Sequence, residues 1–354
     1  MELYIYSPDI ELQGVIDGYS SLRWRRRFFE PGEFELHCKA SAENIAMLQE
    51  GNIIHRVDRK EAGIIEGITI GVPSNNSGAG EEITATGRMG SSMLDRRIIT
   101  PTINFSGKVE DAMRKAVSDN AITARPLPHL ILGEAAGLTP TCSFQATGKT
   151  VLAVCEALGK AAPLGFRVRL DVPNKQWIFE VYGGTDHSVV QTVNPWVVFS
   201  GENQNINNPS YTRDSTGCAN YAYVAGEGEG SARVIVEVDK TGGEPRRELW
   251  VDARDLQKGD LSDVDYLAQL VQRGLEKLAE TARVENFSAD AVDTANFAYL
   301  TDWNLGDIVS FEKWNILLNQ RITEVEEIYE NGIETVTPVC GTPLPETLDL
   351  GSDT

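Results

Sequence analysis

The chain has 354 residues, of which 41% are hydrophobic and 24% charged, and this is ordinary for a globular protein of two or three domains. It lacks a run of about 18 apolar residues, which excludes a membrane-spanning helix of usual length. The formal net charge of −20 makes the surface as a whole repel nucleic acid phosphates. Acidic proteins are also simply soluble, so charge alone does not show whether an acidic wall lines a passage for DNA.

The start of the chain reads as a strand. Met1 to Tyr6 have neither the basic nor the apolar region of a signal peptide, so we expect the chain to fold in a cytoplasm. The five cysteines show no C-x-x-C pairing, which predicts isolated buried thiols instead of disulfides or a zinc site. They are Cys38, Cys142, Cys155, Cys218 and Cys340.

The first hundred residues are strand-like. Residues 21–29 and 33–38 predict a hairpin across Glu30-Pro31-Gly32, because apolar and polar side chains alternate. The arginines between Arg23 and Arg27 suit either a basic nucleic-acid patch or a solvated strand face. The alternating Trp24 and Phe28 favour the strand face.

Shorter signals follow in the same region. Residues 41–48 predict a short helix capped by Ser41. Residues 73–80 form a loop, not a domain linker, because residues 82–87 resume as a strand.

The composition changes near residue 100. Residues 109–117 and 151–158 are apolar at helical spacing, and residues 166–170 and 177–181 read as strands. Thr147 to Thr150 resemble the end of a phosphate-binding loop, but Ser143 stands where that motif needs glycine. These residues more simply begin a helix capped by Thr147.

A third section begins at Trp196. Residues 196–200, 220–224 and 233–238 read as strands. Ser262 and Asp265 form a capping box before a helix at about 262–282. We expect one apolar stripe along this helix, made by Val264, Leu267, Val271, Leu275 and Leu278.

The last predicted element is a hairpin. Ile322, Val325 and Ile328 are three apart, which favours a helix. Asn331-Gly332 followed by residues 333–337 favours two strands joined by a type I′ turn, and we predict strands with a bulge. The polar residues from Thr342 are expected to fray.

One local pattern occurs twice, near the two ends of the chain. Residues 51–55 followed by 64–68 match residues 306–310 followed by 322–325. Each copy is a glycine and a polar residue opening an aliphatic strand, then a second strand with Glu two residues after an Ile. The match predicts two versions of one β unit, although two copies alone also suit chance.

Catalytic signatures are missing. The four histidines (His37, His55, His129 and His187) have no metal-ligand spacing, and Asp186-His187 lacks a nucleophile elbow that would support a hydrolytic triad. Residues 226–230 are glycine-rich but carry two glutamates, which favours a hairpin tip over a phosphate site. We therefore predict no catalytic, cofactor-binding or metal-binding residue and no enzyme activity.

The third section resembles a known family. Ser200, Asn205, Tyr211, residues 220–226, 305–309 and 321–325 through Gly341 resemble, in this order, the tail hub of long-tailed bacteriophages, the hub region of Tal-type proteins related to the baseplate hub of contractile tails. Residues 30–36 are similar to the opening of the same family. The resemblance covers nearly the whole chain, to about residue 345.

The resemblance implies a β-rich α+β fold with two tube-type, β-barrel-like domains and an α+β domain between them. The implied division is 1–100 for the first tube-like domain, 101–195 for the middle domain, 196–345 for the second tube-like domain with its inserted helix, and 346–354 for a flexible tail.

It also implies a homotrimer. Two tube-like domains per subunit would form a pseudo-hexameric ring that adapts the six-fold tail tube or distal tail ring to a three-fold tip, in the distal tail of the virion. The implied partners are the distal tail protein or tail tube ring, the tape measure protein, and tip or fibre proteins.

Relatives often continue into a peptidoglycan-degrading or host-binding extension, whereas this chain is expected to stop just after the hub. A trimer would carry 3 × −20 = −60 formal charges, and we expect part of this excess to line a channel that passes DNA without binding it. Two alternatives stay open: a hub-like hydrolase of the cell wall, and a monomeric carbohydrate-binding β protein with an aromatic-lined groove.

Overall fold

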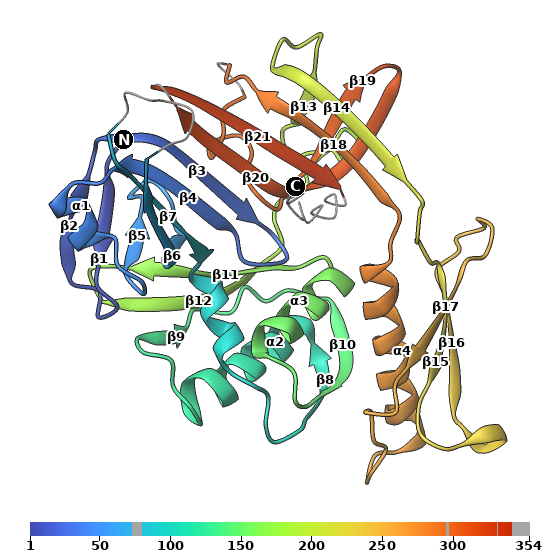
Figure 1. The fold of residues 1–354 in the computed structure, drawn as a ribbon. Coiled ribbons are helices and arrows are strands. Elements are labelled where there is room, and N and C mark those ends of the chain that lie inside the picture. The colour runs from blue at the N-terminus through green and yellow to red at the C-terminus, as the bar shows by residue number, and fades with distance from the viewer. Residues whose placement is uncertain (73–79, 295–296, 331, 342–354) are drawn as a thin grey trace, which may run out of the picture.

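A computed structural model describes residues 1–72, 80–294, 297–330 and 332–341. Its main feature is a 13-stranded sheet built from strands of both ends of the chain (Figure 1). Three smaller sheets have two, three and three strands. The fold is β-rich α+β, as predicted. None of the sheets in these ranges closes into a barrel, so the barrel-like closure implied by the resemblance is absent within one chain.

The large sheet draws seven strands from the N-terminal part and six from the C-terminal part. The N-terminal strands are β1 (Leu3–Tyr6), β2 (Leu12–Ile16), β3 (Tyr19–Arg27), β4 (Glu33–Lys39), β5 (Ile53–His55), β6 (Ala62–Gly71) and β7 (Glu82–Met89). The C-terminal strands are β13 (Val198–Ser200), β14 (Ile206–Asp214), β18 (Val284–Ala291), β19 (Ile308–Lys313), β20 (Ile316–Glu330) and β21 (Ile333–Gly341). The main path runs β14-β18-β21-β20-β3-β4-β7-β6-β5-β1-β2, and β19 pairs with both β13 and β20.

The N-terminal hairpin is confirmed. β3 and β4 pair antiparallel with Trp24 opposite Phe34, and both side chains enter one apolar core. The short helix α1 (Ala42–Met47) has Ser41 as its N-cap, with the Ser41 side chain accepting a hydrogen bond from Asn44 N.

The middle of the chain packs two helices against small sheets around a second core. The helices are α2 (Val109–Val117) and α3 (Val151–Ala161), and the strands are β8 (Ile103–Lys108), β9 (Leu130–Leu132), β10 (Thr141–Ala146), β11 (Gly165–Asp171) and β12 (Gln176–Tyr182). The predicted cap of α3 is wrong by three residues. Thr150, not Thr147, accepts from Ala153 N, because Gly148 has φ +68° and turns the chain before the helix begins.

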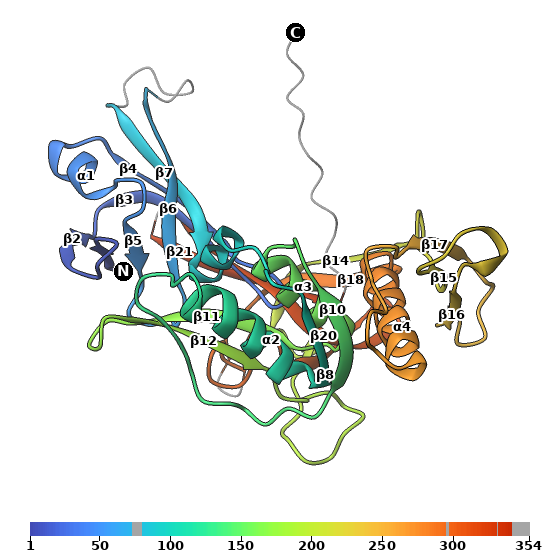
Figure 2. The same ribbon diagram turned by 90° about the horizontal axis from the view of Figure 1, so that it is seen from below.

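A separate layer holds the longest helix (Figures 1 and 2). The helix α4 (Asp263–Glu280) covers one face of a sheet made of β15 (Tyr221–Ala225), β16 (Ile235–Asp239) and β17 (Glu248–Asp252). The Ser262 cap is confirmed. The predicted stripe is partly wrong, because Val264 and Leu267 are 76% and 41% exposed. The helix lies between the small sheet and α3 with β10, so it buries Tyr266 and Leu270 together with polar residues.

The C-terminal hairpin is also confirmed as two strands. β20 pairs antiparallel with β21, and a bulge lies between Ile322 and Glu324. The bulge brings Ile322 and Val325, three residues apart, into the same core, which explains why their spacing also suited a helix. The predicted turn at Asn331, the loop at 73–79 and the tail from 342 fall outside the described residues.

Candidate functional site on the shared sheet

The large sheet contains two β units with the same strand order. The first β unit runs β3-β4-β7-β6-β5, and the second β unit runs β14-β18-β21-β20-β19. Every pairing inside each unit is antiparallel. The predicted repetition is therefore present as a repeated topology.

The glycine turn of the predicted pattern is the same in both units. Gly51 has φ +84° and Gly306 has φ +94°, a conformation that glycine adopts without strain. Gly51 N donates to Ile65 O at 2.8 Å, and Gly306 N donates to Ile322 O at 2.9 Å. In return, Ile65 N donates to Asn52 O at 2.9 Å, and Ile322 N donates to Asp307 O at 2.8 Å.

These bonds correct the predicted alignment by one residue. Ile65, not Ile64, is the counterpart of Ile322. Each is followed by a one-residue bulge, at Ile65/Gly67 in β6 and at Ile322/Glu324 in β20. Glu66 consequently corresponds to Thr323, so the shared glutamate of the sequence pattern was coincidental.

The two β units join edge to edge where β3 pairs with β20, and we call this pairing the within-chain seam. On one face of the sheet the seam carries alternating charges. Arg25 Nη2 lies 2.8 Å from Glu326 Oε1, and Arg27 Nε lies 3.0 Å from Glu324 Oε2. We call this surface the polar face; it includes Arg23, Arg25, Arg27, Glu33, Glu35, Thr84, Glu324 and Glu326.

Neighbouring arginines act differently on the two glutamates. Burial raises the pKa of Glu326, but hydrogen bonds from Arg23 and Arg25 outweigh it and hold that pKa below its usual value. For Glu324 burial prevails over Arg25 and Arg27, and its pKa is raised. The predicted strand face of Arg23, Arg25 and Arg27 is present but only partly solvated, because Arg25 and Arg27 are 14% exposed. The charges of these arginines are shared with carboxylates instead of being free for phosphate.

The opposite face of the within-chain seam holds a buried ionic cluster. Glu327 is fully buried, and its carboxylate accepts from Arg56 Nη1 at 2.6 Å and Arg59 Nε at 3.0 Å. Tyr299 OH also donates to it at 3.0 Å. Burial raises the pKa of Glu327, but Arg59 and Arg56 outweigh it, so the carboxylate stays ionised.

A second buried pair lies beside it. Arg26 Nη2 is 2.9 Å from Glu61 Oε1, and Arg26 Nη1 donates to Tyr299 OH at 2.8 Å. The burial of Arg26 was not predicted, because the whole arginine run indicated one strand face. Its position between Trp24 and Phe28, in strict alternation, was the signal that it points inward.

Residues considered for chemistry are not brought together. His187 Nδ1 lies 2.8 Å from Pro195 O, a backbone contact. All five cysteines are free, with Cys218 half-buried and the others buried. Within the described ranges no group of three His, Cys, Asp or Glu side chains is placed to hold a metal, and no helix is long and apolar enough to cross a membrane.

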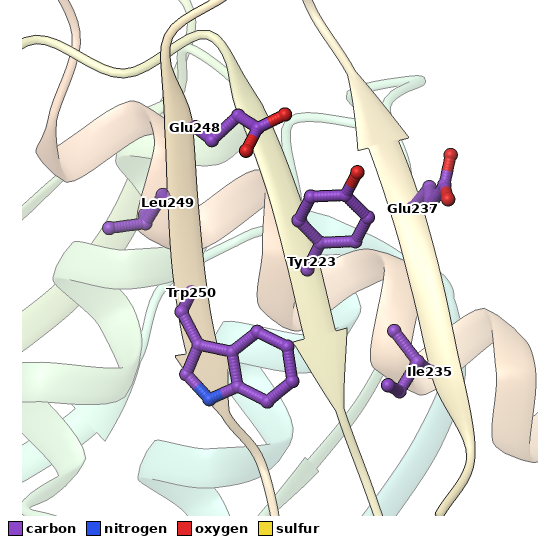
Figure 3. Close-up of a pocket in the computed structure, with 6 residues that line it drawn as sticks. All are labelled: Tyr223, Ile235, Glu237, Glu248, Leu249 and Trp250. Carbon is purple, nitrogen blue, oxygen red and sulfur yellow. The ribbon is translucent and has the colours of Figure 1, made fainter. Parts of the chain in front are cut away.

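A shallow hollow of about 670 Å³ lies on the exposed face of the β15–β17 sheet. Figure 3 shows the Tyr223 ring on the middle strand between Trp250 on one side and Glu237 on the other. Trp250 is 56% exposed. The hollow is lined by Tyr223, Ile235, Glu237, Glu248, Leu249 and Trp250.

The repeated unit and the shared sheet agree with the hub resemblance. A profile of the family described as Siphovirus ReqiPepy6 Gp37-like protein matches residues 2–342. The chain belongs to this siphovirus family. A search of curated proteins gives no match.

Solved structures share the fold of this siphovirus family member over nearly its full length. A tail protein from Neisseria meningitidis MC58 is 14% identical with a TM-score of 0.60, covering 96% of this chain and 95% of that one. The 43 kDa tail protein of prophage MuSo2 from Shewanella oneidensis is 11% identical with a TM-score of 0.60, covering 97% and 99%. Prophage tail protein gp18 from Listeria monocytogenes EGD-e is 9% identical with a TM-score of 0.56, covering 97% and 96%. The resemblance predicted from the sequence is confirmed at the level of family and fold: the chain belongs to a siphovirus family and shares its fold with proteins described as tail proteins.

Proposed function

We propose that three copies of this chain form a pseudo-hexameric hub ring at the distal end of the tail. The observation that carries the proposal is the repeated strand order of the two β units, joined edge to edge by the within-chain seam. Three chains supply six such units, which matches a six-fold tube on one side and a three-fold tip on the other. The barrel-like closure absent in one chain would then arise in the ring.

The proposed channel wall is the polar face. Its strand residues are exposed in part, from 45% for Arg23 and Glu35 to 14% for Arg25 and Arg27. Its arginines are already paired with carboxylates, so phosphates gain little by approaching. We infer that DNA slides past such a wall instead of binding to it.

The proposed neighbours are the distal tail protein or tail tube ring, the tape measure protein, and tip or fibre proteins. In this proposal the domain division at residues 100 and 195 separates the ring-forming β units from the α+β part. The protein needs no cofactor and performs no catalysis in this role.

Light scattering of the purified chain tests the ring directly. The proposal expects a mass three times 38.8 kDa, and averaged electron images with six-fold features in a three-fold particle. A chain that remains monomeric at high concentration, alone and with its tail tube partner, contradicts the proposal.

The hollow on the β15–β17 sheet favours one alternative, a carbohydrate-binding module. Tyr223 and Trp250 present aromatic surface of the kind that packs on sugar rings. This alternative expects quenching of tryptophan fluorescence by cell-wall oligosaccharides, abolished by Trp250→Ala. No observation of this kind favours the hydrolase alternative. Clearing of a peptidoglycan zymogram by the purified protein would establish it.

A further inference from the structure

Several strand edges of the large sheet have no partner in the described residues: those of β2, β13 and β14, and one edge of the outer half of β6. The last two belong to different β units, at the places that correspond to β3 and β20. β14 pairs with β18 alone, so its other edge is open. In β6, Gly67–Gly71 pair with β7, while β5 reaches only Ala62–Ile64. The β6–β7 hairpin projects at one end of the molecule and β14 lies on the opposite side of the sheet (Figures 1 and 2).

The chain itself shows what fits the open edge of β6. The matching segment of the second β unit is the outer half of β20, residues Glu324–Glu330, and β3 of the first unit pairs with it. Each unit therefore offers the same segment after the same bulge, but only the second has it covered. The counterpart of β3 in the second unit is β14, which also has an open edge.

The registers fix which residues correspond. Starting from the glycine turn, a row of paired residues crosses each unit and ends on its first strand. The row is Ile65, Gly87, Phe34 and Trp24 in the first unit, and Ile322, Cys340, Phe287 and Tyr211 in the second. Tyr211 thus takes the place of Trp24, and Thr212 that of Arg25. By the matching bulges, Thr69 takes the place of Glu326.

We propose that β14 of one copy pairs antiparallel with Gly67–Gly71 of a second copy, with Thr212 opposite Thr69. Arg25 and Glu326, their counterparts, face each other in this way across the within-chain seam. The inference rests on the proposed trimer and names its contact surface. Three such pairings, alternating with three within-chain seams, close the ring.

Both edges carry apolar side chains that are exposed in the single chain, and the proposed pairing with a second copy would cover them. Ile70 and Val72 are 49% and 63% exposed, although their counterparts Glu327 and Tyr329 lie inside the buried ionic cluster. At the other edge Trp314 is 55% exposed, and its ring centre lies 6.1 Å from that of Phe287, the neighbour of Tyr211.

The two kinds of seam therefore differ in chemistry. The within-chain seam is ionic on both faces, with Arg25–Glu326 on one and Arg56–Glu327 on the other. The seam between copies joins threonines on the polar face, and apolar Trp314 to Ile70 and Val72 on the opposite face. Association of separate chains then relies on apolar burial and backbone pairing, which salt does not screen.

Cysteine pairs test the register. In a Cys218→Ser background, Thr69→Cys with Thr212→Cys places two thiols directly opposite on one face, within reach of a disulfide. Both threonines are outside the apolar cores, so the variants keep the fold. The control Ile70→Cys with Thr212→Cys puts the thiols on opposite faces. Mild oxidation followed by non-reducing denaturing gels measures the covalent trimer.

The expected result is a covalent trimer for the Thr69–Thr212 pair and at least tenfold less for the control. A trimeric mass by light scattering without this crosslink, or with equal crosslinking of the control, overturns the inference and leaves the proposed ring standing. A monomeric mass overturns both.

Discussion

Glu327 of the second β unit and Arg56 of the first lie 2.6 Å apart (Oε2 to Nη1), with their side chains 0% and 1% exposed. They join strands from opposite ends of the chain across the within-chain seam. A buried charge loses its hydration, so it is tolerated only when it is paired and hydrogen-bonded. The pair therefore fixes the orientation of one β unit against the other.

Removing the carboxylate at this position should be strongly destabilising. Glu327→Ala leaves the buried guanidinium groups of Arg56 and Arg59 with only the half-exposed Asp58 as counter-charge, and we expect a loss of about 3 kcal/mol in the free energy of unfolding. Denaturant titration measures it. The matched control is Glu330→Ala, on the same strand but exposed, with an expected loss below about 0.5 kcal/mol. Equal effects would show that the cluster does not hold the units together.

Alanine substitutions at the two repeated glycines, Gly51 and Gly306, should lower the stability of the protein by different amounts. Both have positive φ, so each substitution introduces backbone strain of about 1 kcal/mol or more. A Cβ on Gly306 would also meet the Phe28 ring at 2.5 Å, whereas on Gly51 the nearest atom, of Pro8, is 3.7 Å away. We expect Gly306→Ala to lower the melting temperature clearly more than Gly51→Ala. Gly332→Ala, with positive φ and open surroundings, reports the backbone cost alone.

His37 should make the stability of the first β unit depend on pH. Although burial lowers its pKa, hydrogen bonds with Glu35 and Glu82 raise it above the ordinary value. A base with a raised folded-state pKa stabilises fully below its unfolded pKa of about 6.5, and this contribution is lost as pH rises through the folded pKa. The stability gap between wild type and His37→Gln should thus be larger at pH about 5.5 than at about 8.5. A gap that grows with pH would contradict the assignment.

The sequence was sufficient for local elements and for the family, but not for long-range pairing. Alternation in β3 and β4 and the cap at Ser262 are local signals, and they predicted the structure correctly. The pairing of Arg25 with Glu326 joins residues about 300 positions apart, and neither strand pattern indicates its partner. Arg26 and the polar residues of α4 were missed because burial among charges depends on tertiary neighbours, not on the residue itself.

Replacing an acidic residue of the polar face by a basic one should make the proposed ring bind DNA. Glu35 lies on this face with its side chain 45% exposed, so Glu35→Lys adds an accessible ammonium group at each copy of the proposed ring. We expect measurable, salt-dependent retention of DNA by the trimer in gel-shift assays at low salt. Glu237→Lys, the same charge change outside the shared sheet, should have little effect. Retention by both variants would assign the effect to net charge, not to a channel.

A charged side chain on the open edge of β6 should weaken the association of the copies without affecting the folding of the single chain. Ile70 is 49% exposed in one chain, so Ile70→Glu should leave the melting temperature of the monomer within a few degrees of wild type. Against Trp314 of a second copy the new carboxylate would be buried without a partner, which weakens association by at least about tenfold, or about 1.4 kcal/mol. Ile333→Glu, at an exposed site on β21, is the matched control. Dilution series followed by light scattering give both dissociation constants, and an unchanged value for Ile70→Glu would place the contact between copies elsewhere.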